Sequence, residues 1–245
     1  NPSSPVMESH QRNAGGNARI VETMLRYFRF PRDFEQMVYL SQVQQGLAIK
    51  TAIEFWRSTK PRCMGTLYWQ LNDNWPVASW SSLEYGGKWK HLHYHARRFY
   101  APLAVMTIPV DQGSNLEFWA INDNAETVAA TATVEVWEFD GKRFDGVELP
   151  AELAPHSAKM LGKFPLSQFG DDTERIDRFL EIVLRGDVAG NTVTHRNEWF
   201  FHAYKRHALG DALVDAIPAD RQGQWTITLT TDKPAFYVWV NAEGI

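Results

Sequence analysis

The sequence lacks several features that would place it at once in a chemical class. Cys63 is the only cysteine among 245 residues, which excludes an internal disulfide, and no obvious partner nearby would make its thiol reactive. The net charge is only −4, with both signs interspersed, so no polyanionic partner such as nucleic acid is indicated. Apolar runs fall short of the roughly 18–20 residues of a membrane helix, and the N-terminus has no signal-peptide pattern. We expect the chain to be soluble and to have no membrane partner. The sequence does not indicate a cellular compartment.

Aromatic residues, in contrast, are abundant. The chain has ten Trp, fourteen Phe and eight Tyr, many of them beside polar residues rather than inside apolar runs. The opening Asn-Pro-Ser-Ser-Pro is neither an initiator nor a signal sequence, so we expect the chain to begin within a longer protein. Its length leaves room for one large domain or two smaller ones.

The first hundred residues predict three helices and one buried strand. Helical spacing of apolar residues predicts helices over residues 17–30, from Asp33 to Arg57, and over residues 89–99 before Pro102. Residues 64–70 are rich in β-compatible aromatics with little alternation, which is typical of a strand buried on both faces. This order is the pattern of a parallel α/β fold such as a (β/α)8 TIM barrel.

Beyond Pro102 the pattern changes to period two. Every second residue from Val128 to Val136 is apolar and predicts one face of a strand. Further strands are predicted at residues 116–121, 179–184, 224–230 and 236–240, with turn signals at residues 140–141, 187–191 and 221–223. The pattern predicts antiparallel, immunoglobulin-like β-sandwich material, with a weak seam near residues 205–211.

Residues 64–89 are the most informative stretch for chemistry. Barrel strands deliver their C-terminal ends to the active site, so Trp69 could stack its indole on the C–H face of a sugar ring, or it could fill a core. The side chains of Gln70, Asn72 and Asp73 could bind sugar hydroxyls or brace the loop. Trp75 stands beside a proline, where tryptophan usually packs.

This stretch, together with Ser-Gln-Val-Gln-Gln-Gly-Leu-Ala-Ile-Lys at residues 41–50 and His-Leu-His-Tyr-His-Ala-Arg-Arg-Phe-Tyr-Ala-Pro-Leu at residues 91–103, closely resembles the β-mannosidases of glycoside hydrolase family two. The resemblance is strong up to about residue 105 and loose beyond it. It implies a multidomain, exo-acting, retaining enzyme that hydrolyses terminal non-reducing β-D-mannose residues from mannosides and manno-oligosaccharides, as in mannan degradation.

The resemblance also implies a division of the chain and a set of partners. Residues 1–101 would be the C-terminal part of the TIM-barrel catalytic domain, residues 102–206 an immunoglobulin-like β-sandwich, and residues 207–245 the start of a second, incomplete sandwich. The partners would be a carbohydrate substrate and the N-terminal remainder of the same enzyme, with no cofactor. Trp69 falls on the tryptophan that lines the terminal mannose subsite, and Asn72, Asp73 and Trp75 are the other substrate-binding candidates.

Retaining glycosidases need two carboxyl groups about 5–5.5 Å apart. The two glutamate motifs of the family, one beside an Asn and one in a Ser-Glu-Phe-Gly-like stretch, do not occur in this sequence. We therefore expect both catalytic glutamates upstream and the chain alone to be inactive. Glu8 and Asp73 are weaker candidates, because Glu8 fits a loop residue at the barrel rim and an Asn-Asp pair commonly bonds its own backbone.

Other interpretations remain open. His91 and His95 stand four residues apart, but no acidic residue completes a helical zinc motif, so no metal site is predicted. The barrel could serve another β-glycosidase of the same family: a β-galactosidase, β-glucuronidase or exo-β-glucosaminidase. The sandwich could instead be a noncatalytic carbohydrate-binding module that uses exposed aromatics such as Trp119 and Trp137, or a purely structural support.

Overall fold

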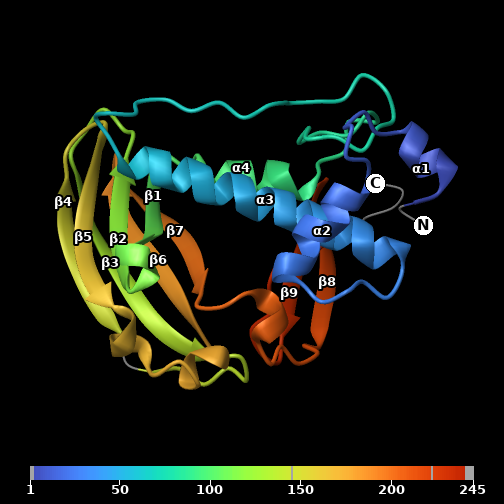
Figure 1. Cartoon of the computed structure of the whole chain (residues 1–245). Coiled ribbons are helices and arrows are strands. Elements are labelled where there is room, and N and C mark those ends of the chain that lie inside the picture. Colours follow the sequence, from blue (N-terminus) through green and yellow to red (C-terminus); the bar gives the residue numbers. More distant parts are fainter. Residues whose placement is uncertain (1–2, 145, 222, 241–245) are drawn as a thin grey trace.

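Helices occupy the first hundred residues of the protein and antiparallel strands most of the rest (Figure 1). The computed structural model describes residues 3–144, 146–221 and 223–240. The helices are α1 (Pro5–Ser9), α2 (Ala18–Tyr27), α3 (Phe34–Ser58) and α4 (His91–Phe99), with short 3-10 turns η1 (Asp111–Gly113), η2 (Leu166–Phe169), η3 (Glu174–Ile176) and η4 (Tyr204–Arg206). The strands are β1 (Leu103–Val110), β2 (Asn115–Asn122), β3 (Val128–Glu138), β4 (Val147–Leu153), β5 (Ser157–Pro165), β6 (Arg178–Val188), β7 (Asn191–Phe200), β8 (Val214–Arg221) and β9 (Gln224–Thr231).

The three predicted helices are confirmed as α2, α3 and α4. Asp33 is the N-cap of α3, and its carboxylate accepts a hydrogen bond from the Gln36 N–H at 2.7 Å. The Gln36 side chain accepts from the Arg32 N–H at 2.7 Å. One face of α2 and the N-terminal half of α3 bury a shared apolar cluster of Met24, Phe28, Met37 and Val43. No helix among the described residues combines the length and apolar character needed to cross a membrane.

The buried strand predicted at residues 64–70 is not formed within the described chain. Figure 1 shows this segment running back along the length of α3, and it forms no ladder with any described strand. Its side chains nevertheless alternate. The hydroxyl groups of Thr66 and Tyr68 are anchored, to the Tyr100 hydroxyl at 3.0 Å and the Ser82 hydroxyl at 2.9 Å, whereas Leu67 is 95% exposed. A strand needs a neighbouring backbone to pair with, and the described chain places none beside this segment. The described residues therefore include helices of the predicted barrel type but form no barrel.

Seven strands form two antiparallel sheets that pack face to face, in the orders β1-β2-β5 and β4-β3-β6-β7. The predicted alternation of β3 is confirmed, since Val128, Ala130 and Ala132 are buried between the sheets while Ala129 is exposed. The predicted turns at residues 140–141 and 187–191 are also confirmed, with Gly141 and Gly190 at φ +98° and +77°. The predicted antiparallel sandwich is thus present.

β1 is buried on both faces. The outer face of the β1-β2-β5 sheet carries Ala104, Met106 and Ile121, which lie under α3 in a second apolar cluster. The first six residues of β1 are all buried and all but Thr107 are apolar, so its sequence shows no alternation. This burial explains why the period-two pattern did not predict β1.

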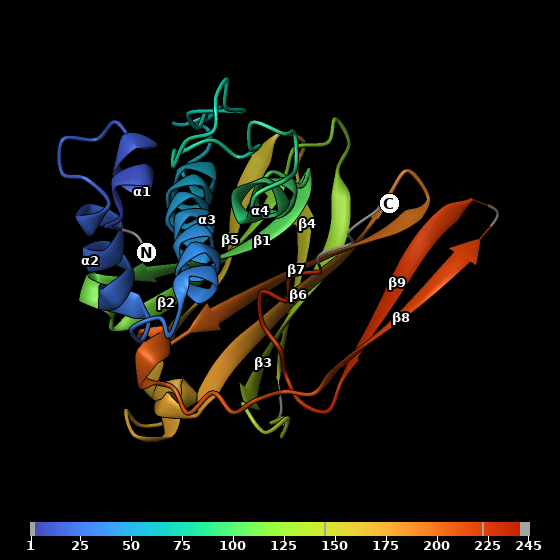
Figure 2. The same ribbon diagram turned by 90° about the vertical axis from the view of Figure 1, so that its right-hand side faces the viewer.

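The β8–β9 hairpin stands away from the sandwich (Figure 2). The predicted strand at residues 224–230 is confirmed as β9, while residue 222, in the predicted turn at residues 221–223, lies outside the described residues. Ala216 pairs with Leu229 and Pro218 with Ile227, which places an apolar row on one exposed face of the hairpin. That the hairpin begins a second sandwich remains a prediction.

The predicted strand at residues 236–240 is wrong. The described residues show no strand there, because the aromatic side chains of this segment are used in packing. The Phe236 ring lies 4.9 Å from that of Phe179 and 4.8 Å from that of Phe200, and the Trp239 ring lies 4.6 Å from that of His91. The segment therefore joins the sandwich to the helices.

Candidate functional site

The loop that follows residues 64–70 folds back on itself as a compact turn. The Leu83 N–H donates to the Leu71 carbonyl at 2.8 Å, and the Ser82 N–H donates to the Gln70 carbonyl at 3.0 Å. Leu83 forms isolated bridges with Asn72 on one side and Trp89 on the other. These bonds fix the backbone immediately after Trp69.

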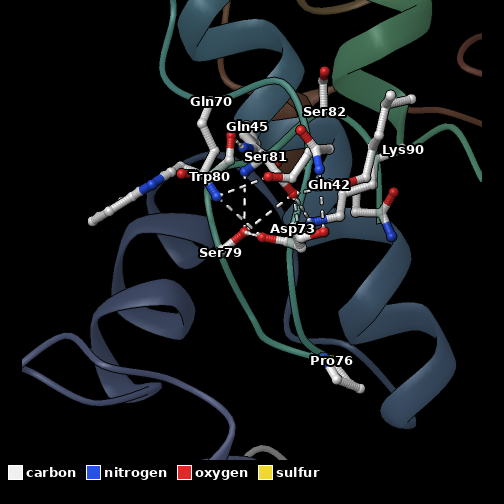
Figure 3. Close-up of polar contacts among 12 residues, drawn as sticks. Gln42, Gln45, Gln70, Asp73, Pro76, Ser79, Trp80, Ser81, Ser82 and Lys90 are labelled. Carbon is white, nitrogen blue, oxygen red and sulfur yellow. Dashed lines mark hydrogen bonds and ion pairs between the residues drawn. The ribbon is translucent and has the colours of Figure 1, made fainter. Parts of the chain in front are cut away.

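A buried carboxylate lies at the centre of this turn (Figure 3). Asp73 is only 5% exposed, and one carboxylate oxygen accepts from the Ser79 hydroxyl at 2.6 Å. The other oxygen accepts from the Ser81 hydroxyl at 2.5 Å and forms an ion pair with the Lys90 ammonium at 3.0 Å. Lys90 also donates to the Ser81 hydroxyl at 2.7 Å. We call Asp73, Ser79, Ser81 and Lys90 the Asp73 brace.

The Asp73 brace favours the ionised carboxylate. Burial alone would raise the pKa of Asp73, but hydrogen bonds from Ser79, Ser81 and Lys90, together with the lysine charge, outweigh it and lower the pKa. The carboxylate is therefore charged at neutral pH. Because its oxygens already accept from Ser79, Ser81 and Lys90, with the Gln70 amide as a fourth donor at 3.4 Å, its geometry favours the bracing role over sugar binding.

Trp69 projects from this fixed base into solvent. Its side chain is 73% exposed, so it does not fill a core within the described chain. The hydroxyl of the preceding Tyr68 donates a hydrogen bond to the Ser82 hydroxyl, which also lies 3.0 Å from His93 Nδ1. The Gln70 amide after it donates to the Asn72 carbonyl at 3.0 Å. An exposed indole with both sequence neighbours held is suited to stacking against a flat apolar surface.

The other predicted binding residues lie on the same loop but in different surroundings. Asn72 is exposed, and its amide donates to the Asp73 carbonyl at 3.3 Å. Trp75 is half-buried, with the His10 ring stacked at 5.6 Å and the Arg12 guanidinium 5.0 Å from its ring centre. Asn72 is thus open to a ligand beside Trp69, whereas Trp75 packs against the segment after α1.

Glu8, the other carboxylate considered for acid or base chemistry, lies in α1. Its carboxylate accepts a hydrogen bond from the Gln11 side chain at 3.1 Å. This local contact supports the loop-bracing interpretation over a catalytic one.

The histidines of α4 are used in packing. His91 and His95 are buried, and His91 lies edge-on to Tyr39 at 5.1 Å. Burial lowers the pKa of His91 to about 4 and is the main cause that lowers that of His95 to about 3. Within residues 3–144, 146–221 and 223–240, no group of three or more His, Cys, Asp or Glu side chains could hold a metal ion.

Sequence reasoning did not identify Ser79, Ser81 and Lys90. Lys90 lies 17 residues from Asp73, and serines in a loop carry no periodic signal. The sequence does show an aspartate, a serine-rich loop and a lysine just before a helix, where Lys90 is the N-cap of α4. These residues indicate a brace only when the folded loop brings them together.

A second polar cluster joins the helices to the sandwich. The buried Arg57 guanidinium donates to the carbonyls of Phe99 and Ala101 and pairs with the Asp123 carboxylate at 2.7 Å. Burial lowers the pKa of Arg57 to about 10, which leaves it charged at neutral pH. The Arg57 contacts fix the end of α4 to the start of the sandwich.

His195 of β7 adds a neutral link at the same junction. The Val105 N–H donates to its Nδ1 at 3.2 Å, so the proton resides on Nε2, which donates to the Arg98 carbonyl at 3.1 Å. Burial is the main cause that lowers the pKa of His195 to about 4. The α3–α4 layer is thus held to the sandwich by specific polar contacts as well as apolar packing.

Comparisons with known proteins agree with this architecture. The Mannosidase Ig/CBM-like domain matches residues 114–206. The chain is 39% identical over 137 residues to a β-mannosidase of Capra hircus, an alignment that covers 50% of this chain and 15% of the relative. Among solved structures, a β-D-mannosidase from Dictyoglomus thermophilum matches with a TM-score of 0.86 and 30% identity over 99% of this chain and 29% of its own. An exo-chitosanase from Amycolatopsis orientalis matches with a TM-score of 0.74 and 17% identity over 95% of this chain and 30% of its own, which shows a shared fold alone.

The chain thus spans less than a third of each of these relatives. The mannosidase matches nevertheless cover both the helical part and the sandwich, and they confirm the predicted resemblance. The chain is similar to the C-terminal portion of the β-mannosidases of glycoside hydrolase family two.

Proposed function

We propose that this chain is part of an exo-acting retaining β-mannosidase that removes terminal non-reducing β-D-mannose residues from mannosides and manno-oligosaccharides. In this proposal Trp69 is the platform for the terminal sugar ring. The observation that carries it is the geometry of Trp69: a largely exposed indole on a braced loop, in a chain related to β-mannosidases.

The barrel belongs to the same proposal. Residues 64–70 are the eighth strand of a (β/α)8 barrel, and the other strands are supplied by the N-terminal remainder of the enzyme. The exposed Leu67 and the absence of a paired neighbour within the described chain support this, because an apolar strand face requires a covering layer. Residues 1–101 would then be barrel, residues 102–206 the immunoglobulin-like sandwich and residues 207–245 the start of a further sandwich.

The two catalytic glutamates, in this proposal, are not residues of this chain. Asp73 is committed to its brace and Glu8 to a local hydrogen bond, so neither is placed as one of a pair of free carboxyl groups at about 5–5.5 Å. The chain by itself is expected to be inactive. Asn72, beside the platform, is the candidate for a hydroxyl contact.

The carbohydrate-binding-module alternative is less well supported. Trp119 and Trp137 are half-buried, and their indole N–H groups donate to Glu117 at 2.9 Å and Glu135 at 3.2 Å on their own strands. Trp119 also packs in the cluster under α3. The N–H hydrogen bonds hold both indoles against their own strands, which makes them less suited than Trp69 to serve as a sugar platform.

Substrate comparison separates the proposal from its relatives within the family. The full-length protein that contains this chain should hydrolyse an aryl β-mannoside and leave the matching β-galactoside, β-glucuronide and β-glucosaminide largely intact. Turnover of one of the other glycosides without turnover of the mannoside would reject the mannosidase assignment while keeping the glycosidase class. Sugar binding by residues 102–245 alone, with no hydrolysis by the full protein, would favour the binding module.

A further inference from the structure

A cavity of about 370 Å³ lies where α2 and α3 meet β7 and the residues that follow it. Its lining residues come from α2 with its C-cap, the middle of α3, the end of β7 with η4, and Tyr237. None belongs to the Trp69 loop. The volume lies within the range of about 300–1,000 Å³ that is typical of small-molecule sites. We call it the junction cavity.

Aromatic side chains form much of its wall. The Phe28 and Tyr204 rings are stacked with centroids 5.0 Å apart, and the Phe200 ring lies 4.7 Å from Tyr204. Trp199 and Tyr27 extend this wall, and Tyr27 is half-exposed. Rings that hold one another in place give a rigid surface suited to the C–H face of a cyclic ligand.

Polar groups of both kinds line the same cavity. The hydroxyl groups of Thr23 and Thr51 donate to helix carbonyls at 2.8 and 2.9 Å, so their oxygens keep lone pairs to accept a further hydrogen bond. Lys50 provides ammonium donors, and the Glu198 carboxylate provides acceptors. A ligand rich in hydroxyl groups, which both donate and accept, matches this mixture.

Three lining residues carry a polar atom that is buried without a hydrogen-bond partner in the part of the chain that the structure describes. One of them, His202 Nε2, lies 3.6 Å from the Asp172 carboxylate. The other two are Gln44 Oε1, an acceptor, and Trp199 Nε1, a donor. Such orphaned atoms are costly unless a further group satisfies them. A small shift of either side chain toward a bound hydroxyl would supply the missing bond.

The charges of the cavity argue for a neutral ligand. The Lys50 ammonium lies 3.5 Å from the Glu54 carboxylate and 4.0 Å from that of Glu198. Its charge is therefore already balanced, and no surplus cation remains to bind a phosphate or carboxylate.

We infer that the junction cavity is a second, noncatalytic sugar site that takes one neutral pyranose ring. An aromatic wall, donors and acceptors in one enclosure, and balanced charge are together the requirements of such a ring. The site is separate from the Trp69 platform and does not depend on the proposed glycosidase activity.

Titration calorimetry with D-mannose and, separately, D-glucose tests this site in the full-length protein. The background carries Trp69→Ala, which removes the proposed platform. At least one of the two sugars should bind this background, and Ala48→Trp, which adds bulk at the cavity lining on α3, should weaken that binding at least tenfold. Ala48→Ser, at the same position without the bulk, should leave it unchanged.

A second pair of variants covers failure of Ala48→Trp to fold, as judged by circular dichroism. Thr23→Trp on α2 lines the cavity and should abolish binding, whereas Glu22→Trp places the same bulk one residue away on an exposed position. Absence of binding of both sugars to the Trp69→Ala background would overturn the inference, as would equal binding by the filled and control variants. Hydrolysis of aryl β-mannoside is measured separately on the unsubstituted protein, so a failure of the proposed function is seen independently.

Discussion

Replacement of Lys90 by Met tests whether the Asp73 brace holds the loop that presents Trp69. The substitution removes the ion pair at 3.0 Å and leaves a carboxylate that is 5% exposed with only the Ser79 and Ser81 hydroxyls as side-chain partners of comparable closeness. A hydrogen bond to a charged group contributes about 1.5–3 kcal/mol, and breaking a buried ion pair costs about 3–5 kcal/mol. We expect a loss of about 3 kcal/mol, where the two ranges meet.

Hydrogen exchange of the loop amides measures this loss locally. The N–H groups of Ser82 and Leu83 are bonded across the turn, so their protection reports its opening. A loss of about 3 kcal/mol corresponds to a roughly 100-fold fall in protection. Lys88→Met, which removes an exposed lysine from the same loop, is the matched control and should change protection little. Equal protection in the two variants would refute the idea that Asp73 and Lys90 hold the loop.

Three further perturbations address the helices and their junction with the sandwich. Gly46→Ala should lower the stability by about 1–3 kcal/mol in thermal unfolding, because its Cβ would lie 2.4 Å from His95 Cδ2, and unchanged stability would mean that the helices can separate. Arg57→Met should cost about 1–3 kcal/mol, because it leaves two carbonyls without their donor and removes one of the two cations that pair with Asp123, Lys60 being the other, and a neutral result would contradict the junction geometry. His195, with its pKa lowered from 6.5 to about 4, binds a proton more readily when unfolded. Its stability contribution is therefore complete above pH 6.5 and falls by about 3 kcal/mol as the pH drops to 4, and a His195→Gln variant that keeps the full wild-type pH dependence would exclude this group as its source.

The helices were predictable because periodicity, capping residues and prolines agree locally. Asp33 caps α3 as its position before an apolar helical pattern predicts. β3 was equally predictable, since one of its faces is buried and the other is less so. β1 was not predicted as a strand because it is buried on both faces, and a run of almost only apolar residues shows no period of two.

Two sequence patterns failed for reasons of pairing. Residues 64–70 have strand composition, but a strand also requires a partner backbone, which the described chain does not provide. Residues 236–240 have the same composition and instead bury their rings against the helices and the sandwich. Amino-acid composition alone does not distinguish a paired strand from an unpaired extended segment or from a segment that packs through its rings.

The candidate site shows the same division between local and long-range information. The exposed Trp69 and Asn72 follow from the motif that carries the resemblance. The brace does not, because the contact between Asp73 and Lys90 depends on how the intervening loop closes. The Arg57 junction likewise joins groups more than 40 residues apart.

The most direct test of the central claim is kcat/KM for an aryl β-mannoside, measured on the full-length protein and its Trp69→Ala variant. Burying one face of an aromatic ring against a sugar is expected to contribute about 2 kcal/mol. We expect kcat/KM to fall about 30-fold in the Trp69→Ala variant, with circular dichroism and thermal unfolding unchanged. Full activity of the Trp69→Ala variant, or a loss of activity that only follows a loss of folding, would contradict the role of this indole as the sugar platform.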